Sequence, residues 1–215
     1  PRLLNDYELA TKNAIAAGFD GVQVHSANGY LLDQFLRDNA NFRDDRYGGS
    51  IENRIRLLRE VTERVASIAG ADRTAVRLSP NGESQGVDDS NPQPLFTAAA
   101  KALDEIGIAF LELREPGPDG TFGATEVPKL SPAIREVFNG PLVLNSDYTT
   151  VEEAQAKLDE GVADAISFGR TFLANPDLPA RLRNRAALNK DDMKTWYSQG
   201  PEGYIDYPAL ETQPA

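Results

Sequence analysis

The chain has 215 residues, of which 40% are hydrophobic and 26% are charged, and its formal net charge is −11. This composition is typical of a globular protein, and the acidic balance argues against binding nucleic acid or an anionic membrane through bulk electrostatics. The chain contains one histidine and no cysteine. This composition excludes disulfides, thiolate nucleophiles and metal sites built from cysteines or from several histidines.

The sequence shows no sign of a membrane segment or an export signal. No apolar run reaches the ~20 residues needed to cross a bilayer, and the N-terminus has no signal-peptide pattern. A cytoplasmic location is therefore expected. No linker or low-complexity segment divides the chain, so residues 1–215 are expected to belong to one domain.

Five short apolar segments alternate with helical stretches. The predicted strands are Gly21–Val24, Thr74–Leu78, Ala109–Leu113, Leu142–Asn145 and Ala165–Phe168. This alternation is typical of βαβ units and a parallel sheet. No glycine-rich dinucleotide fingerprint follows any strand, which favours a (β/α)8 TIM barrel over an open doubly wound sheet. Because a complete barrel has eight strands, the chain is predicted to hold five βα units of one.

Polar residues mark the expected starts of several helices. The Asn5–Glu8 segment and the Thr150–Glu153 segment are candidate capping boxes. Ser50 precedes a long run with apolar residues at helical spacing, so its hydroxyl is predicted to cap that helix. In Ser131-Pro132, the serine is predicted to cap a helix whose first residue is the proline.

The first strand leads into a polar cluster that contains the only histidine. His25, Asn28 and Tyr30 fall within six residues, where the apolar alternation stops. An imidazole, an amide and a phenol could bind a substrate oxygen and supply a proton to a neighbouring atom. The alternative is a strand end whose histidine only caps a loop. In barrels, functional groups lie at the C-terminal ends of strands, which favours the chemical interpretation.

The second strand carries a guanidinium among apolar residues. A charge inside a barrel is costly unless it is paired. Arg77 is therefore expected either to meet an anion or an electron-rich ligand atom, or to form an internal salt bridge with Glu112 or Glu115.

The ends of the last two strands have features of a phosphate site. Barrels commonly bind phosphate in their last two strand-to-helix loops. Ser146 and Asp147 follow one strand, and Gly169 and Arg170 follow the next. The glycine permits close backbone approach and the arginine adds a bidentate positive charge. An acidic side chain beside a phosphate is unfavourable, so Asp147 is assigned a role through its backbone only.

Two further segments have a structural and a functional interpretation. The Arg43–Arg54 segment could grip a phosphate through its glycines, but a tight turn that feeds the capped helix is favoured. Near the C-terminus, Trp196, Tyr197, Tyr204 and Tyr207 could pack on the surface or form an aromatic wall over a flat ligand.

Several long motifs, in order across nearly the whole chain, carry a family resemblance. They are Gly18–Leu31, Tyr47–Arg54, Ser167–Arg170 and Glu202–Pro208. Together they resemble the Old Yellow Enzyme family of flavin-dependent ene-reductases. The resemblance implies an eight-stranded barrel that carries FMN and reduces activated C=C bonds of α,β-unsaturated substrates with NADPH or NADH.

The resemblance also implies roles for single residues. His25 and Asn28 would bind the carbonyl or nitro oxygen of the substrate, and Tyr30 would give a proton to the α-carbon. Arg77 would lie near the N1–C2 carbonyl edge of the flavin. The remaining implied contacts are the phosphate site Ser146, Asp147, Gly169 and Arg170, and the substrate-pocket aromatics Tyr197 and Trp196.

The match covers the C-terminal portion of the family's barrel, after roughly three strands. Those earlier strands supply further flavin contacts, and five strands alone would expose two sheet edges. The expected partner is therefore the N-terminal barrel segment, as a separate chain or in the parent protein. One alternative is a non-enzymatic fragment that cannot hold FMN alone. Another is a different flavin- or phosphate-binding barrel enzyme, against which the His25–Tyr30 cluster and the Tyr204–Pro208 motif argue.

Overall fold

The computed structural model describes residues 2–121 and 123–210. Five parallel strands form one sheet in the order β1-β2-β3-β4-β5. Because strand order follows chain order, the sheet has the connectivity of a barrel and not that of a doubly wound sheet. The predicted bounds of β2 and β4 are confirmed, and the other three differ by one or two residues at their ends. The bounds are β1 Val22–Ser26, β2 Thr74–Leu78, β3 Phe110–Arg114, β4 Leu142–Asn145 and β5 Ala165–Ser167.

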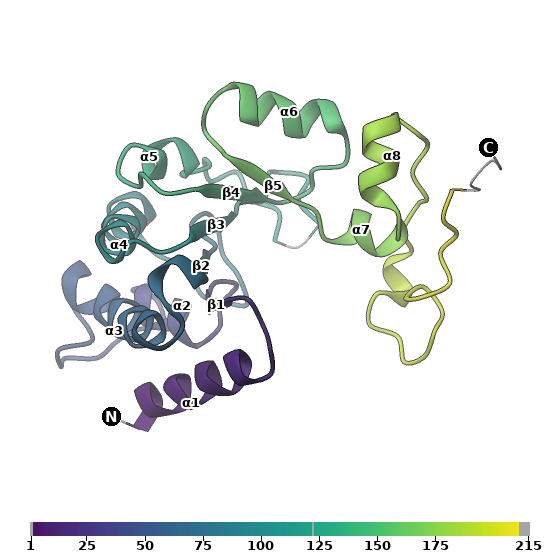
Figure 1. The fold of residues 1–215 in the computed structure, drawn as a ribbon. Helices are drawn as coiled ribbons and strands as arrows, with labels where there is room; N and C mark the ends of the chain where they lie inside the picture. The colour runs from purple at the N-terminus through teal and green to yellow at the C-terminus, as the bar shows by residue number, and fades with distance from the viewer. Residues whose placement is uncertain (1, 122, 211–215) are drawn as a thin grey trace.

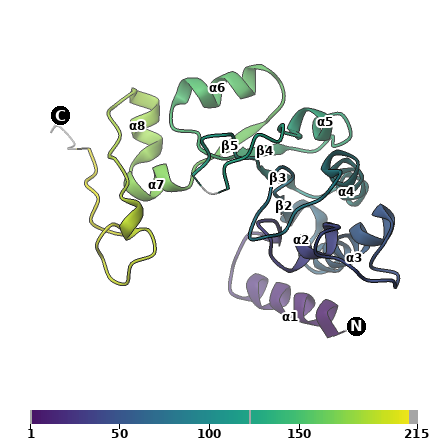
Figure 2. The ribbon, with the colours of Figure 1, turned by 180° about the vertical axis from the view of Figure 1, so that it is seen from behind.

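The helices follow the outer side of the sheet in chain order, and the two termini lie at opposite ends of this arc (Figures 1 and 2). No helix in the described parts of the chain is long and apolar enough to span a membrane. The helices are α1 Arg2–Ala16, α2 Leu31–Leu36, α3 Ile51–Ala69, α4 Pro92–Ile106, α5 Ser131–Arg135, α6 Val151–Asp159, α7 Arg170–Ala174 and α8 Leu178–Asn184, with 3-10 turns at Ala71–Arg73 and Met193–Thr195.

Two predicted helix starts are confirmed. The hydroxyl of Ser50 accepts a hydrogen bond from the backbone N–H of Asn53 at the start of α3. The hydroxyl of Thr150 accepts one from the N–H of Glu153 at 3.2 Å, at the start of α6. In both helices a local side chain satisfies a backbone donor that has no partner inside the helix.

The other two predicted starts are wrong. The helix α1 begins at Arg2, so the Asn5–Glu8 segment lies inside it, and the carboxylate of Glu8 pairs with side chains instead. Ser131 is the first residue of α5 and does not cap it. There the carboxylate of Glu115 accepts the N–H groups of Leu130 and Ser131. A residue distant in sequence thus supplies the cap, and Glu115 is removed from the candidate partners of Arg77.

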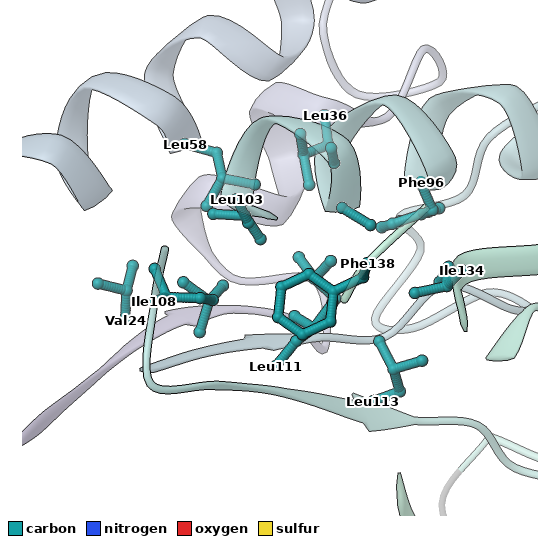
Figure 3. Packing of buried hydrophobic residues seen from close by; sticks show 14 of the residues in the cluster. Val24, Leu36, Leu58, Phe96, Leu103, Ile108, Leu111, Leu113, Ile134 and Phe138 are labelled. Carbon is teal, nitrogen blue, oxygen red and sulfur yellow. The ribbon is translucent and has the colours of Figure 1, made fainter. Parts of the chain in front are cut away.

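The two faces of the sheet differ in chemistry because alternate residues of a strand point to opposite sides. The outer face packs against the helices, and Figure 3 shows Leu111 and Leu113 among side chains of the surrounding helices, such as Leu58, Phe96 and Leu103. The register pairs His25 with Arg77, Arg77 with Glu112, and Arg114 with Asn145. These polar residues therefore share the inner face: Gln23, His25, Arg77, Glu112, Arg114, Asn145 and Ser167.

Candidate functional site

A pocket of about 860 Å³ lies at the C-terminal ends of the strands. This volume is within the range of sites that hold cofactors and small ligands. The pocket brings together every site residue that the sequence predicts except His25. These residues are Asn28, Tyr30, Arg77, Ser146, Asp147, Gly169, Arg170, Trp196 and Tyr197.

His25 lies next to this pocket, on the edge strand β1. It lines a neighbouring hollow of about 440 Å³ with Tyr7 and Phe19. Its ring centroid is 5.3 Å from that of Tyr30, with the two planes 56° apart. Burial, and then the charge of Arg77, lower the pKa of His25. The imidazole is therefore neutral at pH 7, with one N–H donor and one acceptor nitrogen.

A strained turn presents Asn28 and Tyr30 to the pocket. Asn28 and Gly29 have φ angles of 58° and 76°. A Cβ on Gly29 would collide with the carbonyl oxygen of Ser84, so only glycine fits. The Oδ1 atom of Asn28 is buried and has no hydrogen-bond partner among the described residues, and its Nδ2 donates to none of them. The side-chain amide can therefore accept from a ligand through Oδ1 or donate to a ligand oxygen through Nδ2.

A buried ion pair holds this turn from below. The backbone N–H of Asn28 donates to Ser79 Oγ at 2.7 Å, and that of Gly29 donates to Asp33 Oδ2 at 2.8 Å. Asp33 Oδ1 in turn lies 3.0 Å from Arg37 Nε, and both side chains are fully buried. Burial raises the pKa of Asp33. The sequence interpretation missed this pair, although an acid and an arginine four residues apart in an apolar helix are a detectable signal.

Arg77 stands on the inner face with only part of its hydrogen-bonding capacity used. Its Nη2 donates to Asn145 Oδ1 at 2.9 Å. Glu112 Oε2 is 3.9 Å from Arg77 Nε, which is buried and has no hydrogen-bond partner among the described residues. Glu112 instead accepts from Gln23 and from Ser167, at 2.9 and 2.7 Å. The internal salt bridge therefore exists only as a loose pair, and one donor remains open.

The loop after β4 has an unusual backbone conformation. Ser146 and Asp147 have φ angles of 136° and 55°, which non-glycine residues adopt at a cost of order 1–3 kcal/mol each. Ser146 Oγ is buried without a hydrogen-bond partner among the described residues. The carboxylate of Asp147 accepts from Thr121 Oγ1 at 2.7 Å and lies 3.5 Å from Arg170 Nη2. The acidic group is thus directed at other side chains.

Gly169 leaves open space beside the last strand. A Cβ built on this residue would meet no atom within 4 Å. The packing of the chain therefore does not require glycine here, and the space beside its backbone is open to a ligand in the pocket that Gly169 lines.

The Arg43–Arg54 segment forms the tight turn ahead of the capped helix, as the structural interpretation predicts. A Cβ on Gly48 would collide with the carbonyl oxygen of Arg43, and Gly48 also accepts a hydrogen bond from Asn53 Nδ2 at 3.0 Å. Arg54 forms an ion pair with Asp89, whose side chain is fully buried. These contacts fix a turn ahead of α3, and the segment contributes nothing to the lining of the pocket.

The C-terminal aromatics divide between the two interpretations. Trp196 and Tyr197 line the pocket, as expected of an aromatic wall, and Tyr197 does so at its open rim, with 84% of the residue exposed. Tyr204 is 67% exposed, and Tyr207 Oη accepts the N–H of Asp192 at 3.0 Å. Tyr204 and Tyr207 therefore belong to the surface.

One wall residue, Arg114, is absent from the sequence interpretation. It is the last residue of β3, half-buried, and it lines the same pocket as Arg77 and Arg170. Its position two residues after Glu112 places it on the inner face, so alternation could have identified it. In residues 2–121 and 123–210, no group of three or more His, Cys, Asp or Glu side chains is arranged to hold a metal ion.

The fold is part of an α/β barrel, with a pocket at the strand ends that is lined by Arg77, Arg114 and Arg170. The chain belongs to the NADH:flavin oxidoreductase / NADH oxidase family, whose model matches residues 2–189. A putative 12-oxophytodienoate reductase 10 from Oryza sativa subsp. japonica is 43% identical, over 99% of this chain and 69% of the relative. 12-Oxophytodienoate reductase 2 of Arabidopsis thaliana is 40% identical, over 99% and 57%.

Two solved structures agree with this assignment. An Old Yellow Enzyme homologue from Zymomonas mobilis superimposes with a TM-score of 0.95 and 63% identity, over 98% of this chain and 59% of that one. Morphinone reductase in complex with tetrahydroNAD gives a TM-score of 0.89 and 43% identity, over 98% and 56%. The predicted family and fold are confirmed, and the chain spans somewhat more than half the length of most of these relatives.

Proposed function

We propose that this chain carries the flavin and substrate site of an FMN-dependent ene-reductase, which reduces activated C=C bonds of enones and nitroalkenes with NADPH or NADH. One observation carries the proposal. The pocket holds an unpaired amide and a phenol at one end, Asn28 and Tyr30, and open cationic and hydroxyl donors at the other. This arrangement suits a redox cofactor with an anionic tail beside an oxygen-bearing substrate.

The residues present fit FMN. Ser146 Oγ and Arg77 Nε are buried donors without hydrogen-bond partners among the described residues, and such groups are expected to find partners in the working protein. Ser146, Asp147, Gly169 and Arg170 would hold the phosphate, with Asp147 neutralised by Arg170. Arg77 would lie at the N1–C2 edge of the ring, and FMN when bound would supply hydride to the β-carbon of the substrate.

The substrate would lie against the strained turn. His25 and Asn28 would bind its carbonyl or nitro oxygen, and their hydrogen bonds would strengthen as negative charge builds there. Tyr30 would then transfer its phenolic proton to the α-carbon. Trp196 and Tyr197 would cover the other side of the pocket and exclude water.

We further propose that residues 1–215 form the C-terminal part of one FMN-binding barrel domain, with an N-terminal barrel segment as partner. Within the described residues, the strands β1 and β5 each have one neighbour in the sheet, and edges of this kind can pair with a further strand. His25, on the edge strand, would become part of the main pocket when that edge is covered. A cytoplasmic location is part of the same proposal.

The test is flavin binding by reconstitution. FMN is titrated into the chain by itself and into the chain mixed with the N-terminal barrel segment of the Zymomonas mobilis homologue. Flavin absorbance and fluorescence are recorded in both titrations. We expect saturable binding in the reconstituted protein, weakened by Arg170→Ala. If the reconstituted protein binds no FMN, the chain is a non-enzymatic fragment and the proposal is wrong. Unchanged affinity in Arg170→Ala would remove that residue from the phosphate site.

A further inference from the structure

Arg114 is placed between the two halves of the proposed flavin site. It is the last residue of β3 and is paired in register with Asn145 of β4. A Cβ built on Gly123 would lie 3.7 Å from both terminal nitrogens of Arg114. The guanidinium therefore lies beneath the loop that follows β3, at the wall of the pocket.

The guanidinium has no acceptor in the described chain. The side chain of Arg114 makes no hydrogen bond or ion pair with residues 2–121 and 123–210, while the nearby carboxylates interact with other groups. Asp147 accepts from Thr121 and lies against Arg170. Glu112, on the same face as Arg114, accepts from Gln23 and Ser167. All of the donors of Arg114 are therefore open.

The electrostatic setting is unfavourable for this cation without a ligand. Burial, and then the positive charge of Arg77, lower the pKa of Arg114, although Asp147 acts in the opposite direction. A half-buried charge beside a like charge is stabilised further when an anion binds next to it. A guanidinium offers two parallel N–H donors, which match phosphate oxygens.

We propose that Arg114 binds a phosphate group of a ligand in this pocket. The inference rests on the proposed function and adds a residue to it. Two phosphate-bearing ligands share this chemistry: FMN, whose tail would lie at Ser146 and Arg170, and NADPH or NADH, which must approach the same opening. Arg114 lines the pocket together with Ser146 and Arg170, next to Gly123 in the loop that follows β3.

The experiment uses the reconstituted protein with Arg114→Met, which keeps the length of the side chain and removes its charge. Arg59→Met, on the exposed outer surface of α3, is the matched control. The dissociation constants of FMN and of riboflavin, which lacks the phosphate, are measured first. The KM for NADPH is then compared with that for 1-benzyl-1,4-dihydronicotinamide, a phosphate-free hydride donor. Melting temperatures without ligand are recorded for each variant.

Phosphate binding predicts a selective loss. If FMN is the source, Arg114→Met raises the dissociation constant of FMN about 10- to 100-fold, while riboflavin binding is unchanged. If the dinucleotide is the source, only the KM for NADPH rises. In either case Arg114→Met leaves the melting temperature without ligand unchanged or higher, because an unpaired half-buried charge has been removed. Arg114→Lys keeps the positive charge but lacks the two parallel N–H donors, so its loss of ligand affinity is intermediate between wild type and Arg114→Met.

Three results overturn the inference. Equal FMN and NADPH parameters in wild type and Arg114→Met exclude phosphate binding by this residue. Equal losses for riboflavin and FMN, with a lower melting temperature, show a purely structural role. Third, a wild-type protein that binds no FMN contradicts the proposed function and the inference with it. This outcome differs from the first result, in which wild type and Arg114→Met both bind FMN with equal affinity.

Discussion

Removal of Asp33 is predicted to be among the most damaging single changes in the chain. Asp33 and Arg37 are both fully buried and 3.0 Å apart. Breaking a buried pair by removing one partner costs about 3–5 kcal/mol, because the other charge is left uncompensated. Asp33→Ala also leaves the N–H of Gly29 without its acceptor. Among the described residues, the one other carboxylate within 4.0 Å of the Arg37 guanidinium is that of Asp88, which lies 3.5 Å away and is 46% exposed.

The assay is equilibrium urea unfolding, followed by far-UV circular dichroism. We expect Asp33→Ala to lower the free energy of unfolding by about 3–5 kcal/mol, while the exposed Asp6→Ala, on α1, changes it by less than about 0.5 kcal/mol. Arg37→Met should cost a similar amount to Asp33→Ala. The double variant should lose less than the sum of the two, with a coupling energy of about 1–3 kcal/mol.

Two results would refute this reasoning. A loss below about 1 kcal/mol for Asp33→Ala would show that the pair does not stabilise the fold. Strict additivity in the double variant would show that the two side chains do not interact in solution.

Three further predictions concern chemistry and pH. Tyr30→Phe should slow oxidation of the reduced flavin by an enone about 10²- to 10⁴-fold while reduction by NADPH stays intact, and equal loss in both half-reactions would contradict proton donation. Ser79→Ala removes the acceptor of the Asn28 N–H, so the KM for the enone should rise with FMN affinity unchanged; parallel losses would contradict this positioning role. Burial raises the pKa of Glu115 above its ordinary value of 4.5, so the folded chain binds the proton more tightly than the unfolded chain. The stability of wild type, measured by urea titration, should therefore fall relative to that of Glu115→Gln as pH rises from 4.5 through the raised pKa. Parallel pH curves would show that the pKa is not raised.

Local patterns in the sequence predicted the architecture well. All five strands carry apolar residues, and all except β3 include a β-branched one. The hydroxyls of Ser50 and Thr150 act within three residues of their own position. Signals of this kind depend only on neighbours along the chain, so they can be recognised without the fold. The motifs around His25 and Gly169 were likewise visible as strand ends.

Long-range contacts account for what the sequence interpretation missed. Glu115 caps α5 across an intervening loop, and this displaced the local candidate Ser131. Asp33 accepts the N–H of Gly29 within its own segment. The Ser79 hydroxyl, which accepts from the N–H of Asn28 and donates to Asp33, comes from a residue 46 positions further along the chain, directly after β2. Arg114 stands out only because its guanidinium has no acceptor among the described residues. Whether a side chain has an acceptor depends on which carboxylates the fold brings close to it, and the sequence does not reveal this.

The most direct test of the central claim is turnover of an enone by the reconstituted, FMN-loaded protein. NADPH oxidation is followed anaerobically with and without 2-cyclohexenone, and the product is identified by gas chromatography. We predict that oxidation depends on the enone and yields cyclohexanone in equal amount to the NADPH consumed. A protein whose bound flavin is reduced by NADPH but is never reoxidised by cyclohexenone or by a nitroalkene would contradict the assignment of this site to C=C reduction.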